Sequence, residues 1–307
     1  YHELFNLERN EDEIINDSKM LVKIIEKLEY NSFYDIIKQL INKIKGVFSI
    51  VLLELNSNTI YCFKDRYGLR PLCVGKSSQG YCLASESNAL YDYDYLREIE
   101  NGEIIKINDL GLRNLYKYDT TYKCEKICLF EFVYFLNKNS IFKNKLEHNK
   151  ETSVEDIRLY FGKMLASEEK YVFNLENRKD IIIIGSPDTG IPSGKQFADS
   201  LDLNYKQFLI KKKKAGRSFI LENNESRSLQ VKNKFSVDTS IDIKDKIVFF
   251  IDDSLVRGNT IKVVVDILKE YDPKEIHIRI SSPQVRNTCY YGIDIPTKEE
   301  LIINNYS

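Results

Sequence analysis

Apolar residues in this chain fall into short runs that predict strands and into spaced sets that predict helices. The clearest unit spans residues 247–260, where the apolar run IVFFI precedes two aspartates and a short polar loop with one glycine. The run is too short for a helix and is typical of a buried strand. Residues 261–270 place apolar side chains at helical spacing. The pattern predicts a strand, an acidic pair, a loop and a helix, in that order.

A second unit of the same kind lies upstream. Residues 180–185 (DIIIIG) predict a buried strand, and a tight loop over residues 186–192 precedes a helix with the sequence GKQFADSL. Residues 154–169 predict a further helix. Strands that alternate with helices favour a parallel sheet, whose ligands bind beyond the carboxyl ends of the strands.

The first third of the chain has a different pattern. A helix is predicted after Asn16-Asp17-Ser18, and a second over residues 32–44. Short strands with Gly or Asn at the joins follow, which predicts an α+β unit. These strands lie within residues 46–55, 59–65, 67–76, 80–87 and 102–107. Residues 112–126 predict a polar connection at the domain boundary, and residues 137–150 predict a solvated loop.

Length and charge narrow the class of protein. The 307 residues suffice for two domains, and we place them at residues 1–120 and 121–307. A formal net charge of −1 gives no case for nucleic acid or an anionic membrane as partner. No apolar run approaches a membrane span, and the polar opening has no signal peptide. Six cysteines without a CxxC pair favour a reducing, cytoplasmic location.

The loop after the acidic pair offers the groups that a phosphate needs. Gly258 lets a ligand approach the backbone closely. Hydrogen-bonding side chains come from Ser254, Asn259 and Thr260. The free N–H groups at the start of the next helix favour a phosphate monoester. Asp252 and Asp253 suit sugar hydroxyls, a divalent metal, or both. The combination predicts a phosphorylated sugar bound with magnesium.

Simpler interpretations exist for both loops. The first is an ordinary buried strand capped by two aspartates, and the second is a plain turn between a strand and a helix. The small residues and exposed N–H groups of the 186–192 loop also fit an anion nest. A P-loop is excluded, because the chain has no GxxxxGK[ST] and residues 190–195 have the wrong spacing.

The 247–260 stretch resembles the phosphoribosyl pyrophosphate (PRPP) signature of type I phosphoribosyltransferases, in the form found in the amidophosphoribosyltransferase family. The loop SPDTGIP resembles the family's pyrophosphate loop PDSGxP. Upstream, residues 64–72 (KDRYGLRPL) resemble RDPxGIRPL, and residues 84–87 read ASES as in the family. Residues 287–294 (NTCYYGID) resemble PCFYGID, so the likeness covers nearly the whole chain.

The resemblance implies an α/β and α+β fold. A partial N-terminal-nucleophile glutaminase sandwich would precede a type I phosphoribosyltransferase domain with a central parallel sheet. It implies the first committed step of purine biosynthesis, in which PRPP, glutamine and water give 5-phosphoribosylamine, glutamate and pyrophosphate. Ammonia can replace glutamine, and a homo-oligomer is implied. The alternative is a non-catalytic PRPP-binding regulatory protein of the same fold.

The resemblance also assigns roles to residues. Asp252 and Asp253 would act in catalysis and, with Thr189, would bind magnesium. Substrate binding would involve Pro187, Asp188, Thr189, Gly190, Lys211, Arg217, Ser254, Leu255, Val256, Arg257, Gly258, Asn259 and Thr260. Lys214 replaces the tyrosine of the family's mobile loop, which favours the regulator alternative.

Two further assignments concern glutamine and iron. Asp17 matches the aspartate that holds the glutamine amino group, but the family's cysteine nucleophile lies upstream of residue 1. We therefore expect no glutamine hydrolysis from this sequence, either because it is truncated or because the protein is degenerate. Cys128 and Cys289 fall at two of four family positions that hold a [4Fe–4S] cluster. Isolated cysteines are otherwise small buried hydrophobic residues.

Overall fold

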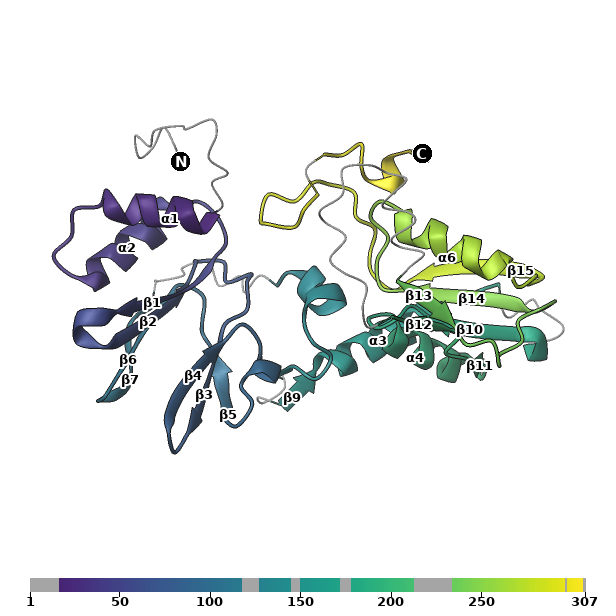
Figure 1. Cartoon of the computed structure of the whole chain (residues 1–307), viewed down its shortest axis with the longest axis horizontal. Coiled ribbons are helices and arrows are strands. Elements are labelled where there is room, and N and C mark those ends of the chain that lie inside the picture. Colours follow the sequence, from purple (N-terminus) through teal and green to yellow (C-terminus); the bar gives the residue numbers. More distant parts are fainter. Residues whose placement is uncertain are drawn as a thin grey trace. The chain divides into compact units, whose positions relative to one another are not determined.

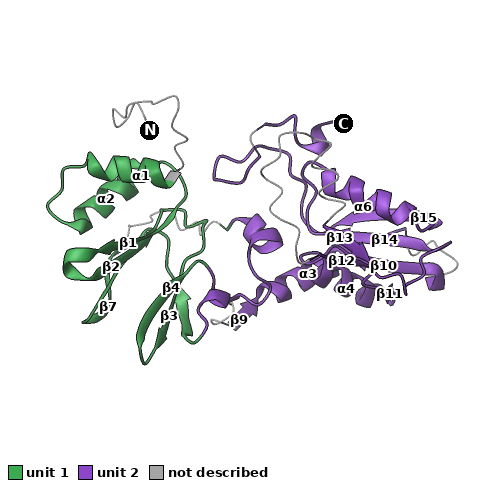
Figure 2. Cartoon of the chain, in the orientation of Figure 1, with its two compact units in different colours: residues 1–85, 92–127 green, residues 86–91, 128–307 purple. Residues whose placement is uncertain are grey.

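A computed structural model describes residues 17–117, 127–144, 150–171, 178–212, 234–295 and 297–305. The chain forms two compact units (Figure 2). Unit 1 contains residues 1–85 and 92–127, and unit 2 contains residues 86–91 and 128–307. Each unit has its own hydrophobic core, so each is described by itself.

Unit 1 is built on a four-stranded antiparallel sheet in the order β1-β2-β6-β7. Its strands are β1 (Ser49–Glu54), β2 (Thr59–Lys64), β6 (Glu103–Asn108) and β7 (Gly111–Lys117). Two helices, α1 (Asp17–Glu26) and α2 (Phe33–Lys43), share a core with it. The Ser32 hydroxyl accepts a hydrogen bond from the Asp35 N–H and so caps α2, which lies within the helix predicted over residues 32–44.

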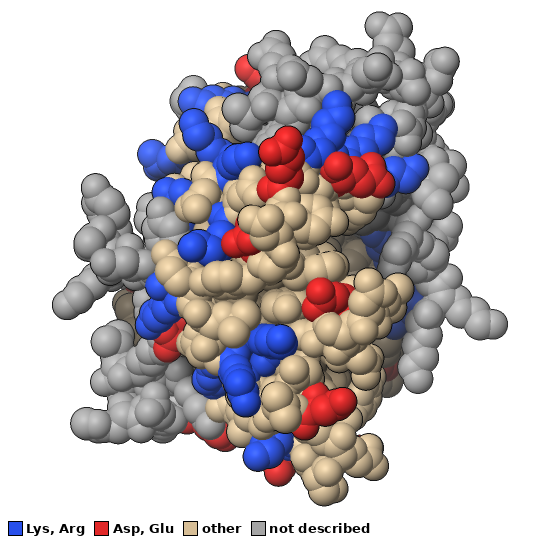
Figure 3. Space-filling view, turned by 90° about the vertical axis from the view of Figure 1, so that its left-hand side faces the viewer, with Lys and Arg blue, Asp and Glu red and all other residues tan. Residues whose placement is uncertain are grey.

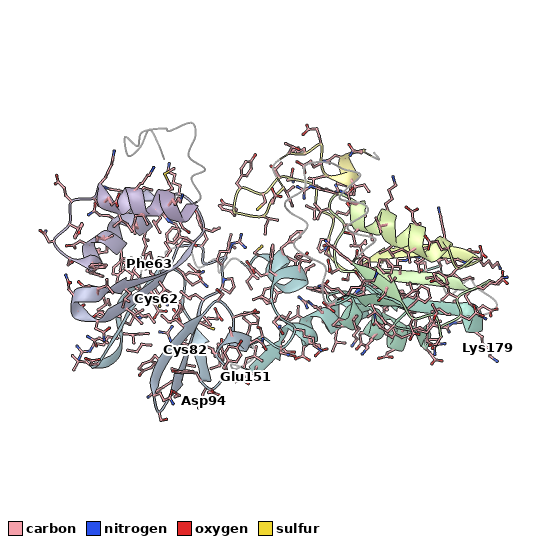
Figure 4. All side chains as sticks on the ribbon, in the orientation of Figure 1. Cys62, Phe63, Cys82, Asp94, Glu151 and Lys179 are labelled. Carbon is pink, nitrogen blue, oxygen red and sulfur yellow. The ribbon has the colours of Figure 1, made fainter. Side chains whose placement is uncertain are left out.

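A second, three-stranded sheet completes unit 1 in the order β4-β3-β5. These strands are β3 (Cys73–Ser77), β4 (Gly80–Ala84) and β5 (Asp94–Glu98). Cys62 and Phe63 are neighbours on β2, so they face opposite sides of the first sheet (Figure 4). Phe63 packs in the core with the helices, whereas Cys62 packs with Val74 of the second sheet. The predicted sandwich of helices and antiparallel strands is confirmed.

The boundaries of several predicted elements are wrong. Residues 111–117 form strand β7, not part of a polar connection. Within the predicted loop, residues 141–144 form β8 (Ile141–Asn144), which pairs with β9 (Lys150–Ser153). Strand β5 was not predicted. Edge strands such as β7 expose one face to solvent, so their polar composition resembles that of a loop.

Two buried carboxylates of unit 1 hold its turns and strands in place. The buried Asp65 carboxylate accepts hydrogen bonds from the N–H groups of Phe48, Tyr67 and Gly68, at 2.7, 2.7 and 3.0 Å. The buried Glu103 carboxylate accepts two hydrogen bonds of 2.7 Å from Arg97. On the face of the molecule in Figure 3, acidic and basic side chains are interspersed. Asp65, in the family-like motif of residues 64–72, therefore has a structural role in this unit.

Unit 2 contains a parallel sheet in the order β11-β10-β14-β15. The strands are β10 (Ile181–Gly185), β11 (Asn204–Tyr205), β14 (Ile247–Asp252) and β15 (Glu275–Ile280). Helices α3 (Val154–Glu168) and α4 (Ile191–Leu201) lie on one face and α6 (Asn259–Lys269) on the other (Figure 1). Side chains alternate accordingly: Phe249 packs toward α4, and Phe250 toward α6.

Smaller elements complete unit 2. They are β12 (Leu209–Lys211), β13 (Phe235–Val237), a π-helix (Glu131–Phe135) and 3-10 turns at Ser87–Ala89, Arg178–Asp180 and Ile302–Asn305. In unit 1, a 3-10 turn at Leu55–Ser57 joins β1 to β2. Residues 86–91 join unit 2 because the Glu86 carboxylate accepts hydrogen bonds from the Asn137 N–H and the Ser140 hydroxyl, both 2.7 Å. Within the described ranges, no helix is both long and apolar enough to cross a bilayer.

Helices α3 and α4 meet at a point where only glycine fits. A Cβ added to Gly162 of α3 would lie 2.2 Å from the carbonyl oxygen of Ser193. The Ser193 hydroxyl, in turn, donates a hydrogen bond of 2.9 Å to the carbonyl oxygen of Arg158. This close approach fixes α3 against the helix that follows the 186–190 loop.

We expect Gly162→Ala to destabilise unit 2 by about 1–3 kcal/mol, because the added methyl group would force the two helices apart. Alanine is more favourable than glycine in a helix by about 1 kcal/mol, so helix propensity alone predicts that Gly162→Ala stabilises the protein. Urea denaturation of the variant measures the difference. Lys163→Ala at the exposed neighbouring position is the control. A more stable Gly162→Ala protein would contradict the packing argument.

Candidate functional site

The carboxyl ends of β10 and β14 bring the two predicted loops together. The strands pair in parallel with Gly185 opposite Ile251, and the Ser186 N–H donates a hydrogen bond of 2.8 Å to the Ile251 carbonyl. The loop over residues 186–190 and the loop over residues 252–260 therefore start at the same edge of the sheet. This is the place at which α/β folds bind ligands.

Asp252 and Asp253 are both buried at this edge, with 5% and 6% of their surface exposed. The Asp253 N–H donates a hydrogen bond of 2.9 Å to Asp252 Oδ1. Burial, and then the neighbouring Asp253 charge, raise the pKa of Asp252 to about 7, while hydrogen bonding from Ser186 and from the Asp253 N–H opposes the rise. A carboxyl group with this pKa is poised between its neutral and charged forms at neutral pH.

The Asp253 carboxylate is held by side chains from both loops. The Ser254 hydroxyl donates to Oδ1 at 2.5 Å, and the Thr189 hydroxyl donates to Oδ2. Burial raises the pKa of Asp253, and these two hydroxyls and the Arg158 charge oppose the rise. The hydrogen bond from Thr189 ties the 186–190 loop directly to the acidic pair.

The loop over residues 254–260 leaves its backbone donors available. In the described part of the chain, no acceptor receives a hydrogen bond from the N–H groups of residues 255–260. Gly258 has φ +79° and directly precedes α6, so the N–H groups gather at a helix N-terminus. Asn259 and Thr260 begin that helix and are exposed. Such a nest of donors, together with the helix dipole, favours an anion.

The 186–190 loop is compact for a steric reason. A Cβ at Gly190 would lie 2.8 Å from the Ile251 carbonyl and 2.9 Å from Ser186 Cβ. The peptide between Pro187 and Asp188 is cis. The N–H groups of Asp188 and Thr189 have no acceptor among the described residues. The Asp188 carboxylate is largely exposed and pairs with Lys211 Nζ at 2.9 Å.

The structure brings together most of the residues that the sequence predicted for this site. They are Pro187, Asp188, Thr189, Gly190, Lys211, Asp252, Asp253 and residues 254–260. The Arg257 guanidinium is directed elsewhere, toward Glu300 and Asp294. Arg217 and the side chain of Asp17 lie outside the described residues.

One buried residue at the site was not predicted. Arg158 of α3 is 4% exposed, and its guanidinium donates hydrogen bonds of 2.9 Å to the carbonyl oxygens of Phe132 and Leu136. Burial lowers the pKa of Arg158, and the negative charge of Asp253 opposes this most strongly. No signal in the sequence distinguishes Arg158 from the solvated charges that also occur on this helix.

The site fits a hard divalent cation. Two buried carboxylates and the Thr189 hydroxyl are oxygen donors, and burial raises the pKa of both carboxyls, so a bound cation would favour their charged forms. Mg²⁺ usually takes one or two protein carboxylates and completes its shell with water and substrate phosphates. Among the described residues no group of three or more His, Cys, Asp or Glu could hold a metal, so a closed all-protein site is not formed there.

The two cysteines of the predicted cluster do not fit a [4Fe–4S] group by themselves. Cys128 and Cys289 are partly exposed thiols without a disulfide. The Cys289 sulfur accepts a hydrogen bond of 3.3 Å from the Tyr291 N–H. A cubane is held by four thiolates, and within the described ranges these cysteines join no group of metal-binding side chains.

Comparison with known proteins defines the class. Residues 163–288 match the model of the phosphoribosyl transferase domain, and residues 3–92 match that of a glutamine amidotransferase domain. The parallel sheet and both loops of the site lie within the first match. The chain thus joins parts of a glutamine amidotransferase domain and of a phosphoribosyltransferase domain.

Curated proteins named amidophosphoribosyltransferase are similar to most of this chain. The rat protein is 32% identical over 94% of this chain and 57% of its own length. The Methanocaldococcus jannaschii protein is 31% identical over 94% and 61%. The chain is therefore an amidophosphoribosyltransferase homologue that spans about three fifths of these relatives.

Solved structures agree with this relationship. The glutamine PRPP amidotransferase of B. subtilis, complexed with ADP and GMP, has a TM-score of 0.79 and 31% identity. The match covers 100% of this chain and 63% of that one. A structure described as the allosteric regulatory enzyme of purine biosynthesis has a TM-score of 0.80 over 99% of this chain. The predicted family and fold class are confirmed.

The raised pKa of Asp252 predicts a pH-dependent stability. The folded state binds this proton more tightly than the unfolded chain, whose aspartates have a pKa near 3.9, so stability from this group falls as pH rises from about 4 to about 7. The difference in free energy of unfolding between Asp252→Asn and wild type should therefore shift in favour of the variant by on the order of 2 kcal/mol from pH 5 to pH 8. Urea denaturation without ligand at both pH values measures this.

The matched control is Asp266→Asn, which changes an exposed aspartate of α6. Its stability relative to wild type should not change over the same pH range. A pH-independent difference between Asp252→Asn and wild type would show that Asp252 is already charged at pH 5.

Proposed function

We propose that unit 2 binds PRPP with Mg²⁺ and transfers its phosphoribosyl group to ammonia. The observation that carries this proposal is the buried pair Asp252–Asp253, which lies between two loops. The N–H groups of residues 188–189 in one loop and 255–260 in the other have no protein acceptor within the described residues. PRPP carries a phosphate monoester, ribose hydroxyls and a pyrophosphate on one sugar. These three groups need two anion sites with carboxylates between them.

Each group then has a place in the site. The 5-phosphate binds the N–H groups of residues 255–260 at the start of α6. Asp252 and Asp253 accept hydrogen bonds from the ribose hydroxyls. The pyrophosphate binds the backbone of Asp188 and Thr189, with Lys211 nearby through its ion pair with Asp188.

Charge stabilisation is the main catalytic effect that this arrangement supplies. Loss of pyrophosphate leaves positive charge on the ribose ring, and nearby carboxylates stabilise that charge. Arg158 and the hydroxyls of Ser254 and Thr189 favour the charged form of Asp253. Mg²⁺, held by Asp252, Asp253 and Thr189, would neutralise the leaving pyrophosphate.

The complete reaction draws its nitrogen from glutamine. We propose that unit 1 belongs to the domain that releases ammonia from glutamine, and that Asp17 holds the glutamine amino group. The full protein would act in the cytoplasm as a homo-oligomer and would perform the first committed step of purine biosynthesis. Arg217 would contact PRPP from the basic loop. Cys128 and Cys289 remain the proposed cluster thiols, and no step above depends on a cluster.

A PRPP-binding regulator is the second candidate. The substitution that favours it is Lys214, which stands where the family has tyrosine in the loop that closes over PRPP. Such a protein would use the same site for binding but would not release pyrophosphate. Binding and turnover therefore separate the two candidates.

We expect magnesium-dependent release of pyrophosphate from PRPP at high ammonium concentration and alkaline pH, where free ammonia is available. The double change Asp252→Asn with Asp253→Asn should lower the rate by about 100-fold or more, because it removes both preorganised charges. A coupled pyrophosphate assay measures the rate.

Asp266→Asn, outside the site, should leave the rate unchanged. Release without ammonium, or release that persists in the double variant, would argue against phosphoribosyl transfer at this pair. A folded wild-type protein that binds PRPP without releasing pyrophosphate would establish the regulator.

A further inference from the structure

A later segment of the chain contacts the 254–260 loop. This segment comprises residues 294–295 and 297–302, and we call it the strap. The Ile302 N–H donates a hydrogen bond of 2.9 Å to the Val256 carbonyl. A Cβ at Gly258 would lie 2.5 Å from Ile302 Cδ1, so the Ile302 side chain packs directly on the glycine backbone.

Arg257, between these two contacts, is bound to the same segment. Its Nε donates a hydrogen bond of 2.5 Å to Glu300 Oε2, and its Nη2 donates one of 2.9 Å to the Asp294 carbonyl. The other Glu300 oxygen accepts a hydrogen bond of 3.3 Å from the Thr297 hydroxyl. Three consecutive loop residues are thus held by the strap through a backbone bond, an ion pair and a packing contact.

The strap is itself anchored in unit 2. Leu301 is fully buried and Ile295 is 4% exposed. The Asn304 amide donates a hydrogen bond of 2.9 Å to the Lys298 carbonyl, and the Cys289 N–H donates one of 3.2 Å to the Ile295 carbonyl. The two hydrogen bonds are local and shape the strap, and the burial of Leu301 and Ile295 attaches it to unit 2.

A support of this kind is needed because the first part of the loop has little internal restraint. Residues 259–260 belong to α6, and the Lys262 N–H donates to the Gly258 carbonyl. The N–H groups of residues 255–257 donate no hydrogen bond within the described residues, so hydrogen bonds from these groups do not fix their directions. An anion site that must gather several N–H groups around one phosphate gains affinity when these groups are positioned before the ligand arrives.

We infer that the strap positions the phosphate-binding loop, and that Arg257 and Glu300 act as positioning residues for it. Arg257 does this by holding the strap, with its charge turned to Glu300 and Asp294. The inference rests on the proposed function, because it assumes that the loop binds the 5-phosphate of PRPP. It differs from the sequence prediction, which placed Arg257 among the residues that contact substrate.

One charge reversal distinguishes positioning of the loop from long-range electrostatic attraction, because the two predict opposite changes in the affinity for PRPP. Glu300→Lys adds positive charge near an anion site, so long-range electrostatics alone predicts tighter binding of PRPP. The same charge placed against Arg257 breaks the ion pair and lets the loop shift, which predicts weaker binding. Glu299→Lys is the matched control, because Glu299 is exposed and its side chain makes no hydrogen bond or ion pair with the described residues.

Calorimetric titration with PRPP and Mg²⁺ measures the outcome. We expect Glu300→Lys to raise the Kd for PRPP about ten-fold and Glu299→Lys to change it by less than about two-fold. The swapped pair, Arg257→Glu with Glu300→Lys, should restore most of the affinity. If Glu300→Lys melts at a lower temperature than Glu299→Lys, its weaker binding could reflect a loss of stability. Glu300→Gln then replaces it, and we again expect a higher Kd for PRPP.

Two results would overturn the inference. Equal affinity of Glu300→Lys and Glu299→Lys would show that the strap does not set the loop. A swapped pair that binds PRPP more weakly than Glu300→Lys would show that Arg257 contacts the phosphate itself. In both cases PRPP binding by wild type leaves the proposed function intact, whereas failure of wild type to bind PRPP removes both proposals.

Discussion

Two adjacent carboxylates buried at the end of one strand are the constraint around which unit 2 is arranged. Their burial is costly, since desolvation raises both pKa values and the charge of Asp253 raises that of Asp252 further. The surroundings reduce this cost through the hydroxyls of Ser254 and Thr189 and the charge of Arg158. A divalent cation and a ligand with ribose hydroxyls would complete that compensation. The cost of burying the two carboxylates is thus relieved when a cation binds, and this relief would add to the affinity of the pair for that cation.

The parallel sheet makes this arrangement possible, because neighbouring strands β10 and β14 end together and deliver both loops to one edge. Elements farther along the chain then fix the loops. Helix α3 packs on α4 through Gly162 and supplies Arg158. The strap holds the other loop through Arg257 and Ile302. These residues thus shape two loops whose backbone N–H groups we propose as the ligand-binding groups.

The sequence predicted the parts of the site that are local in the chain. The strand, acidic pair, loop and helix follow one another directly over residues 247–270, so apolar periodicity and one glycine reveal them. Arg158 and the pairing of Arg257 with Glu300 depend on long-range packing, which periodicity does not encode. Strands β5 and β7 were missed or misjudged because exposed strand residues resemble those of loops. The roles of individual site residues remain predictions.

The most direct test of the account is the magnesium dependence of ligand binding. Calorimetric titrations of the wild-type chain with PRPP and with ribose 5-phosphate, each with Mg²⁺ or with EDTA, separate the two anion sites. The account predicts that EDTA weakens PRPP binding by about ten-fold or more, because the pyrophosphate then meets the acidic pair without a cation. Ribose 5-phosphate has no pyrophosphate and needs only the loop N–H groups and the hydrogen bonds of its hydroxyls to the acidic pair, so it should bind equally in both conditions. PRPP binding that is absent, or indifferent to Mg²⁺, would contradict the account.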